Sequence, residues 1–392
     1  MRLLVINDFG MQGGGTENRV RLLLNEFLRR GNFGKIHLLQ LSNNKNAFKN
    51  NVISCHYSSG GIRDTYKITR DIIKNEGINI IQAHNMLALT PSSVRAAKDL
   101  KVPVAWFAHD YWPLCAFRSF INPYNSRKMS LCEQAKFSKC VRCVGLRSTL
   151  RLKLFQWLVN KVDVAISPGN FVKDLYESHN VLKGKWRIVK PWIALDIFGN
   201  IKQSEIANQI IFVGPLVDYK GAWVVAESLK YILKVVPDVK LKFIGDNQEK
   251  DGILRKKIEE IGLRDSTLNN MVFVGYKDWE GLKEEYAQGG IGVCTSVCKE
   301  LFGLHWSEAM AAGCPVVASS IGSLPEFIKD NGLLVPPGAP ENLAETVIML
   351  LKDKEYAKAL GQRGRRYALE TFNVKRAADE LIDIYTELLK RG

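Results

Sequence analysis

The chain of 392 residues is too long for one ordinary domain and predicts two domains of about 150–200 residues each. A hydrophobic content of 46% with 24% charged residues excludes a disordered chain, and no apolar run approaches the ~20 residues that span a bilayer. The formal net charge of +15 favours an anionic partner: a nucleic acid, an anionic membrane surface or a phosphorylated substrate. The first apolar run is too short for a signal peptide, so we expect a cytoplasmic protein.

Apolar strand-like runs alternate with helical patterns along the whole chain. This alternation predicts parallel sheets joined by crossover helices. In the first half we expect strands over 3–7, 36–41, 78–83, 102–108, 162–167 and 187–190, and helices over 17–30, 63–75, 91–99 and 171–178.

A second series of strands begins at residue 210. The expected strands cover 210–214, 239–245, 271–275, 290–295, 316–319 and 333–335, and three closing helices cover 340–352, 356–370 and 374–390. Because a polar stretch separates the two series, we predict an N-terminal domain over 1–195 and a C-terminal domain over 196–372. The final helix, 373–392, is expected to pack across both.

Two glutamates stand out in the second half. Glu300 lies in a loop after the strand 290–295, and Glu308 lies about one turn into a short helix expected over 304–312. Loops at the carboxyl ends of strands bind ligands in open α/β sheets. A sugar or ribose diol would supply the hydrogen-bond donors that buried carboxylates need. The alternative is an amphipathic helix whose glutamates face water.

Four segments together resemble a known family. They are Gly13-Gly14-Gly15-Thr16-Glu17, Ala108-His109-Asp110, FVGPLVDYKG at 212–221 and ELFGLHWSEAMAAG at 300–313. In this order and spacing, the chain resembles retaining glycosyltransferases of the family 4 type, which have the GT-B fold. The resemblance implies an α/β protein of two doubly wound, Rossmann-like domains that face each other across a cleft.

The resemblance also implies a role for each site residue. The candidate catalytic residues are His109, which would contact the transferred sugar, Lys220, which would contact the donor diphosphate, and Glu300, which would hold hydroxyls of the donor sugar. Glu308 would hold the ribose. The further donor-binding candidates are Gly14, Gly15, Phe302, Gly303 and Leu304. The glycines allow close backbone approach beside a helix N-terminus, although a tight packing turn would use them equally well.

The implied reaction is front-face transfer from a UDP- or GDP-type sugar to a hydroxyl of a lipid-linked or cell-surface glycan. No Asp-x-Asp triplet occurs, so we expect no divalent ion at the donor and no cofactor for catalysis. Pro215 departs from the family pattern, because family members usually carry Arg there. Either Lys299 or a basic residue of the N-terminal half replaces that charge, or donor binding is weakened. The alternatives are a sugar-nucleotide epimerase and a weakly active nucleotide-sugar-binding subunit.

Four of the eight cysteines crowd an insert over 110–145 that has little regular pattern. They are Cys115, Cys132, Cys140 and Cys143, with the spacing C-x16-C-x7-C-x2-C. One close pair with two further thiols is typical of four-thiolate zinc sites. We therefore expect a structural zinc ion that stabilises the insert. The alternatives are free thiols, disulfides or an iron–sulfur cluster.

A basic, aromatic stretch follows the insert. Arg147, Arg151 and Lys153 alternate there with apolar side chains that include Phe155 and Trp157. Such an amphipathic helix suits the anionic inner face of a membrane, whereas a solvated helix with an ordinary core stripe is the alternative. No nucleic-acid-binding motif accompanies the positive charge, so we expect no nucleic acid partner.

Overall fold

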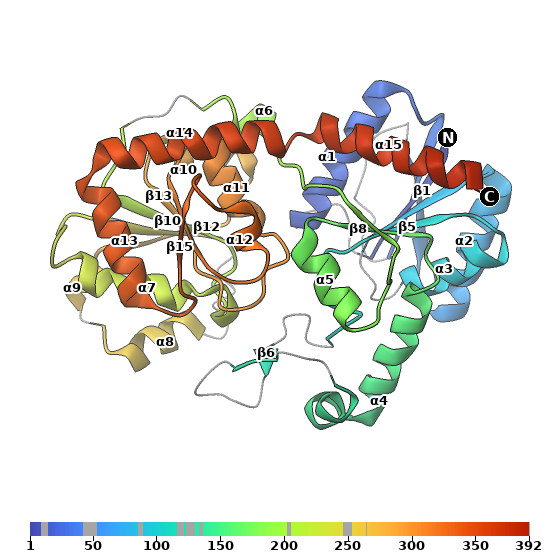
Figure 1. Cartoon of the computed structure of the whole chain (residues 1–392), viewed down its shortest axis with the longest axis horizontal. Coiled ribbons are helices and arrows are strands. Elements are labelled where there is room, and N and C mark those ends of the chain that lie inside the picture. Colours follow the sequence, from blue (N-terminus) through green and yellow to red (C-terminus); the bar gives the residue numbers. More distant parts are fainter. Residues whose placement is uncertain are drawn as a thin grey trace. The chain divides into compact units, whose positions relative to one another are not determined.

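The computed structural model consists of two compact units (Figure 1). The first comprises Met1–Trp192 together with Val374–Gly392, and the second comprises Ile193–Asn373. The predicted boundary after residue 195 lies close to this division. The structure describes residues 1–8, 15–41, 53–84, 89–115, 121–122, 130–132, 136–201, 205–245, 253–263 and 265–391.

The first unit is built on a seven-stranded parallel sheet with the order β3-β2-β1-β4-β5-β8-β9. Its central strands are buried over nearly all of their length, which explains their continuous apolar runs. The chain reverses its winding direction between β1 and β4, where open α/β sheets bind ligands. The strands are β1 (Arg2–Asn7), β2 (Lys35–Leu41), β3 (Ile53–Ser58), β4 (Ile80–His84), β5 (Val104–Phe107), β8 (Val164–Ser167) and β9 (Trp186–Ile188).

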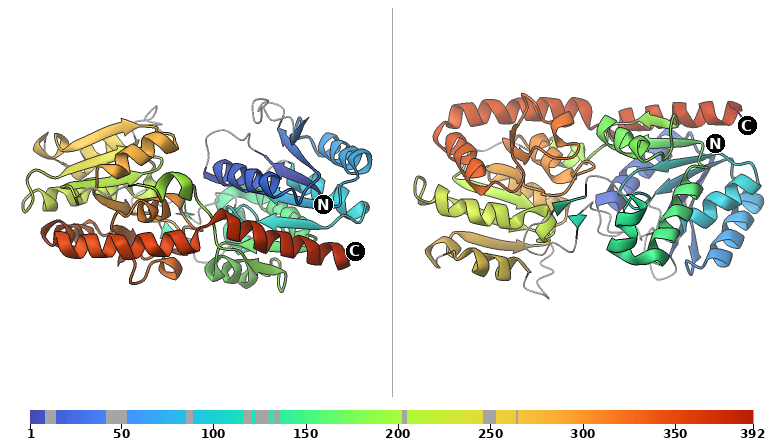
Figure 2. Two further views of the ribbon diagram at one scale, coloured as in Figure 1. Left: turned by 90° about the horizontal axis from the view of Figure 1, so that it is seen from above. Right: turned by 60° about the horizontal axis from the view of Figure 1, so that its bottom comes forward.

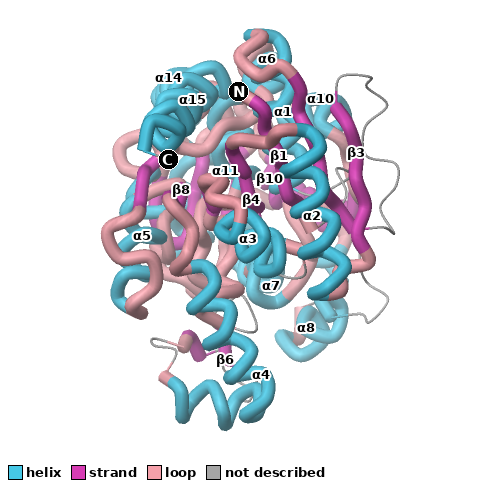
Figure 3. Tube along the Cα trace, turned by 90° about the vertical axis from the view of Figure 1, so that its right-hand side faces the viewer, coloured by secondary structure: helices cyan, strands magenta, loops and turns pink. Residues whose placement is uncertain are grey.

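Helices cover this sheet. Those of the first unit are α1 (Gly15–Arg30), α2 (Ile62–Glu76), α3 (Thr90–Asp99), α4 (Phe137–Val159), α5 (Asn170–Ser178) and α15 (Val374–Arg391). Helix α2 packs beside α3 (Figure 3), and the last helix, α15, packs beside α1 (Figure 2). The prediction that this last helix also contacts the second unit stays a prediction.

The cysteine-rich insert is more regular than its sequence predicted. Two short antiparallel strands, β6 (Ile121–Asn122) and β7 (Ser130–Leu131), form a hairpin. Helix α4 then begins at Phe137, ten residues before the basic stretch that predicted it. Its helical geometry breaks at Gly145, where φ is 79° and ψ is 163°. The prediction missed this first part because it contains cysteines and basic residues in place of a clear apolar stripe.

The second unit carries a six-stranded parallel sheet with the order β12-β11-β10-β13-β14-β15. All six strands were predicted, and the winding direction changes between β10 and β13. The strands are β10 (Gln209–Val213), β11 (Lys240–Ile244), β12 (Met271–Gly275), β13 (Ile291–Cys294), β14 (Val316–Ser319) and β15 (Leu333–Val335). Two parallel Rossmann-like sheets therefore confirm the predicted fold class.

Helices flank this sheet on both faces (Figure 1). They are α6 (Leu195–Phe198), α7 (Ala222–Ile232), α8 (Ile253–Ile261), α9 (Asp265–Leu268), α10 (Trp279–Ala287), α11 (Leu304–Ala311), α12 (Leu324–Phe327), α13 (Pro340–Lys352) and α14 (Lys354–Thr371). Helix α7 packs against α13, and α11 packs against α14. Within the described ranges, no helix is both long and apolar enough to cross a membrane.

Candidate functional site

The second unit pairs Lys220 with Glu300 at the switch point of its sheet. Lys220 ends a short 3-10 turn, Asp218–Lys220, in the loop after β10, and Glu300 lies in the loop after the neighbouring strand β13. The Lys220 Nζ lies 2.5 Å from Glu300 Oε1, and Ser296 Oγ donates to the same oxygen at 2.5 Å. Glu300 Oε2 has no hydrogen-bond donor in the described part of the chain, so it can accept one from a ligand hydroxyl.

Two glycines permit the approach of these loops. Gly221 has φ of 73°, and a Cβ there would lie 1.9 Å from the carbonyl oxygen of Thr295. Gly322 has φ of 64°, and a Cβ there would lie 2.4 Å from the backbone N and O of Glu300. Any other residue at these positions would push the loops apart. The backbone N–H of Ser323 also donates to the Glu300 carbonyl at 2.9 Å.

Both members of the pair remain charged although Glu300 is buried and Lys220 is half-buried. Burial lowers the pKa of Lys220, but the Glu300 carboxylate outweighs it, so that pKa is raised overall. Burial likewise raises the pKa of Glu300, and the Lys220 ammonium outweighs it, so that pKa is lowered overall. The loop therefore holds a fixed positive charge beside a carboxylate, an arrangement suited to an anionic leaving group.

Glu308 lies within α11, one turn after its first residue, as the sequence predicted. The side chain is buried, and in the described part of the chain no donor contacts its carboxyl group. Burial alone raises its pKa to about 7. A buried carboxyl of this kind is stabilised by a ligand that offers hydroxyl donors.

Between the two glutamates, Phe302 packs in the interior, whereas the backbone N–H groups at the start of α11 are left without a side-chain cap. The Phe302 ring packs among Trp306, Phe327 and Phe372 at centroid distances of 5.0 to 5.3 Å, and its carbonyl accepts from Trp306 Nε1 at 2.6 Å. Gly303 precedes α11 with φ of 75° and offers no side-chain cap, so the first N–H groups from Leu304 onward lack one. Free N–H groups at a helix start attract anions.

Pro215, the departure from the family pattern, is exposed in the loop after β10. Lys299 is half-buried beside Glu300. In the first unit, Gly15 begins α1, whereas Gly13 and Gly14 lie outside the described residues. The predicted approach of that glycine loop to a ligand therefore stays a prediction.

His109 stands at the end of a buried hydrogen-bond chain in the first unit. Tyr385 Oη, from α15, donates to Gln82 Oε1 at 2.7 Å, and Gln82 Nε2 lies 2.6 Å from His84 Nε2. His84 Nδ1 lies 2.7 Å from His109 Nε2. Burial lowers the pKa of His84 to about 3, and burial, His84 and Arg19 together hold that of His109 well below its usual value. Both rings are therefore neutral at neutral pH.

This chain selects one tautomer for each histidine. Because the Gln82 amide nitrogen donates, His84 Nε2 accepts and its proton sits on Nδ1. That proton is donated to His109 Nε2, which leaves the His109 proton on Nδ1. His109 thus offers an N–H donor. The sequence predicted His109 but not Gln82, His84 or Tyr385; His84 could have been found, since it ends the strand next to the one before His109.

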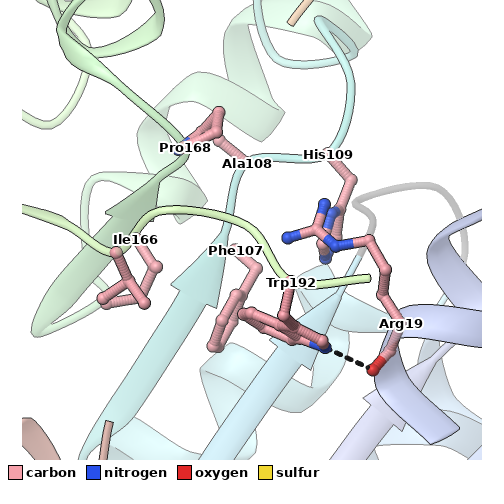
Figure 4. A pocket seen from close by; sticks show the side chains of 8 residues that line it. Arg19, Phe107, Ala108, His109, Ile166, Pro168 and Trp192 are labelled. Carbon is pink, nitrogen blue, oxygen red and sulfur yellow. Dashed lines mark hydrogen bonds between the residues drawn. The ribbon is translucent and has the colours of Figure 1, made fainter. Parts of the chain in front are cut away.

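A recess in the first unit brings Arg19 to His109. Figure 4 shows the Arg19 guanidinium directed toward the His109 ring, with Trp192 below it. Trp192 Nε1 donates to the Arg19 carbonyl at 2.8 Å, and the guanidinium carbon lies 4.7 Å from the Trp192 ring centroid. The apolar wall is formed by Phe107, Ala108, Ile166, Pro168 and Val189. The sequence analysis did not single out Arg19.

The four cysteines of the insert interact electrostatically with one another and form no disulfide among the described residues. Cys115 ends a turn, Cys132 follows β7, and Cys140 and Cys143 occupy the first part of α4. Burial and the neighbouring thiols raise the pKa of Cys140 and Cys143. As the described side chains stand, however, no three of His, Cys, Asp or Glu are grouped to hold a metal ion. The predicted zinc site therefore stays a prediction.

The raised pKa of Glu308 predicts a pH-dependent stability. Between its ordinary value of 4.5 and the folded value of about 7, the folded chain binds a proton that the unfolded chain has released. The free energy of unfolding should therefore fall as pH rises through this window. In Glu308→Gln, which cannot ionise, this fall should be smaller in urea unfolding at pH 5 and pH 7.

The matched control is Glu345→Gln, which changes an exposed glutamate of α13 in the same unit. This variant should keep the pH dependence of the wild-type chain. If Glu308→Gln and Glu345→Gln gave the same dependence, Glu308 would not carry a proton at neutral pH.

Relatives align with this chain over various lengths. Spore coat protein SA of Bacillus subtilis is 29% identical over 45% of this chain and 48% of its own length. An uncharacterised glycosyltransferase of Methanocaldococcus jannaschii is 24% identical over 83% of this chain and 80% of its own. The chain therefore spans about half the length of the first of these relatives.

Two solved structures share the fold. Sucrose-phosphate synthase from Thermosynechococcus elongatus has a TM-score of 0.76 at 20% identity, with both chains covered completely. The Anabaena protein HepE in complex with UDP and glucose has a TM-score of 0.75 at 16% identity, over 99% of this chain and 100% of that one. Family models match both halves: Glycosyltransferase Family 4 over residues 13–197 and Glycosyl transferases group 1 over 196–367. The chain belongs to the family 4, group 1 type of glycosyltransferases with the GT-B fold.

Proposed function

We propose that the chain transfers a sugar from a nucleotide-diphosphate sugar, of UDP or GDP type, to a hydroxyl of a lipid-linked or cell-surface glycan. The observation that carries this proposal is the Lys220–Glu300 pair at the switch point of the second sheet. It places a fixed cation and a partly unoccupied carboxylate where such sheets bind nucleotides. A structural neighbour, HepE, was solved in complex with UDP and glucose, which supports a nucleotide-sugar donor.

Each residue has a defined part in the proposed reaction. Lys220 binds the diphosphate and stabilises the negative charge that develops on it. Glu300 Oε2 and Glu308 accept hydrogen bonds from the donor sugar and the ribose, and the N–H groups at the start of α11 meet a phosphate. His109 donates a hydrogen bond to the transferred sugar. Pro215 supplies no charge to the diphosphate.

The proposed bond changes retain the configuration of the sugar. The bond between the anomeric carbon and the diphosphate oxygen breaks, and the acceptor oxygen forms its bond on the same face. The acceptor proton passes to the departing phosphate oxygen, which therefore serves as the base. No protein nucleophile and no divalent ion are required in this scheme. An epimerase would instead convert the donor without an acceptor, so acceptor-free incubation separates the two activities.

We further propose that α4 rests on the anionic inner face of a membrane. Leu146, Leu150, Leu154 and Trp157 are each between 51% and 56% exposed, and their spacing places them along one side of the helix. Exposed basic residues stand among them: Arg147, Arg151, Lys153 and Lys161. Apolar side chains that dip into a leaflet, flanked by cations, bind anionic lipid surfaces.

The cysteines support a separate proposal, a structural zinc. Cys140 and Cys143 lie one helical turn apart on α4, and Cys132 follows the adjacent hairpin. A zinc ion would draw the four thiols together and deprotonate them. Because no ligand group is preformed among the described side chains, ion binding would order the insert as it binds.

The rate of sugar transfer should depend on the Glu300 carboxylate. Glu300→Gln should lower the transfer rate at least about 100-fold, since a polar contact made to the reacting sugar is lost, while donor binding stays measurable. Transfer can be followed as nucleoside diphosphate release with a panel of donors and glycan acceptors. Removing one member of a buried pair also costs about 3–5 kcal/mol of stability.

The matched control separates these two effects. Glu285 pairs with Lys242 at 2.8 Å in the same unit, with side-chain exposures of 12% and 15%. Glu285→Gln should lower stability by a similar amount and leave transfer nearly unchanged. Full transfer by Glu300→Gln, or equal losses in both variants, would contradict the proposed role.

Binding to anionic membranes should depend on the exposed apolar side chains of α4. The chain should sediment with vesicles of phosphatidylglycerol and phosphatidylcholine, and the Leu150→Gln/Trp157→Gln variant should stay in solution. High salt should weaken binding, because the charges are screened. Ile62→Gln, which changes a 74% exposed residue of α2, should bind like the wild-type chain. Equal sedimentation of all three proteins would contradict the proposal.

Bound zinc should depend on the cysteines of the insert. The purified chain should contain one zinc per molecule, and Cys140→Ser/Cys143→Ser should contain none and melt at a lower temperature. Cys55→Ser, a free cysteine outside the insert, should keep the metal. An active wild-type preparation that contains no zinc would exclude the site.

A further inference from the structure

Arg19 is a half-buried cation, and no acceptor among the described residues pairs with its guanidinium. It lies one turn into α1, and its Nε is shielded from solvent without a hydrogen-bond acceptor in the described part of the chain. Its only specific contacts there are with Trp192, through the ring face and the Arg19 carbonyl. Trp192 therefore fixes the direction of the side chain but satisfies none of its N–H donors.

No described carboxylate compensates this charge. Burial is the one cause that acts on the Arg19 pKa, which it lowers to about 10, so the group still carries its proton at neutral pH. The two histidines that face it, His84 and His109, are neutral and supply no negative charge. A half-buried charge without a partner is costly, so its retention points to an anionic ligand.

We propose that the recess between Arg19 and His109 binds a phosphoryl group of a substrate. The guanidinium offers a planar fork of N–H donors that matches phosphate oxygens. His109 lines the other side of the recess, and its single free N–H is left for the transferred sugar. The recess is shallow and opens to solvent, so a phosphoryl group could meet the guanidinium at its mouth, and the apolar wall strengthens the ionic contact.

This site rests on the proposed function only in naming the substrate, because either a donor diphosphate or a phosphorylated acceptor could supply the group. Binding itself does not depend on transfer. The two proposals can therefore fail separately: loss of phosphate binding leaves the donor site of the second unit untouched.

Inorganic phosphate is titrated into the full chain at low salt, and binding is measured by isothermal titration calorimetry. Arg19→Gln should weaken phosphate binding by about tenfold or more, the effect of losing a charge-assisted contact. Arg19→Lys should bind with intermediate affinity, because it keeps the charge but not the fork. Arg21→Gln removes the same charge from the same helix, where Arg21 bonds to Asn18, and should bind like the wild type.

Melting temperatures without phosphate give a second readout. Removing an uncompensated charge should leave the melting temperature of Arg19→Gln equal to or above that of the wild type, and phosphate should raise the wild-type value more than that of the variant. Equal phosphate affinity in Arg19→Gln and Arg21→Gln, or a wild-type chain that binds none at tens of millimolar, would overturn the proposal.

A competition arm identifies the source of the phosphoryl group. Phosphate is titrated into the wild-type chain with and without saturating UDP. If UDP blocks the Arg19-dependent binding, the site takes a phosphate of the donor. If phosphate and UDP bind together, the site takes a phosphoryl group of the acceptor. Either result supports a phosphoryl site at Arg19, provided that binding requires Arg19.

Discussion

The ion pair between Lys220 and Glu300 is the interaction on which the proposed donor site depends. Its members come from loops that follow neighbouring strands, so the parallel order of β10 and β13 brings together residues 80 positions apart. Close backbone approach at Gly221 lets these loops meet, and Gly322, in the loop after β14, lets a third loop pack against Glu300. Each charge overcomes the cost of burying the other, which leaves a fixed cation and a carboxylate oxygen available to a ligand. The second unit thus holds charge in place before any substrate arrives.

The charges in the first unit are arranged differently from those in the second. There, burial keeps His84 and His109 neutral, and a chain of hydrogen bonds from Tyr385 sets the position of their protons. Arg19 remains charged beside them with no carboxylate in reach among the described residues. One unit therefore offers a balanced charge pair and the other a neutral donor beside an unbalanced cation. Both arrangements favour anionic, hydroxyl-rich substrates, in keeping with the net charge of +15.

Apolar runs predicted nearly all of the sheet strands, because a buried parallel strand is apolar on both faces. The edge strand β3 was missed, since Ile53–Ser58 mixes polar residues with apolar ones and has a neighbour on one side only. Glu300 and Glu308 could be predicted from a local motif. The network behind His109 could not, because Gln82 and Tyr385 are 303 residues apart and meet only when α15 packs on the first unit.

A crystal structure of the chain with a bound nucleotide-diphosphate sugar tests the central claim most directly. The account predicts that the diphosphate contacts Lys220, that a sugar hydroxyl donates to Glu300 Oε2, and that the ribose hydroxyls donate to Glu308. The Lys220–Glu300 pair should keep its geometry, since it is already formed without the donor. A donor bound away from the loops after β10 and β13, or a ligand that displaces Lys220 from Glu300, would contradict it.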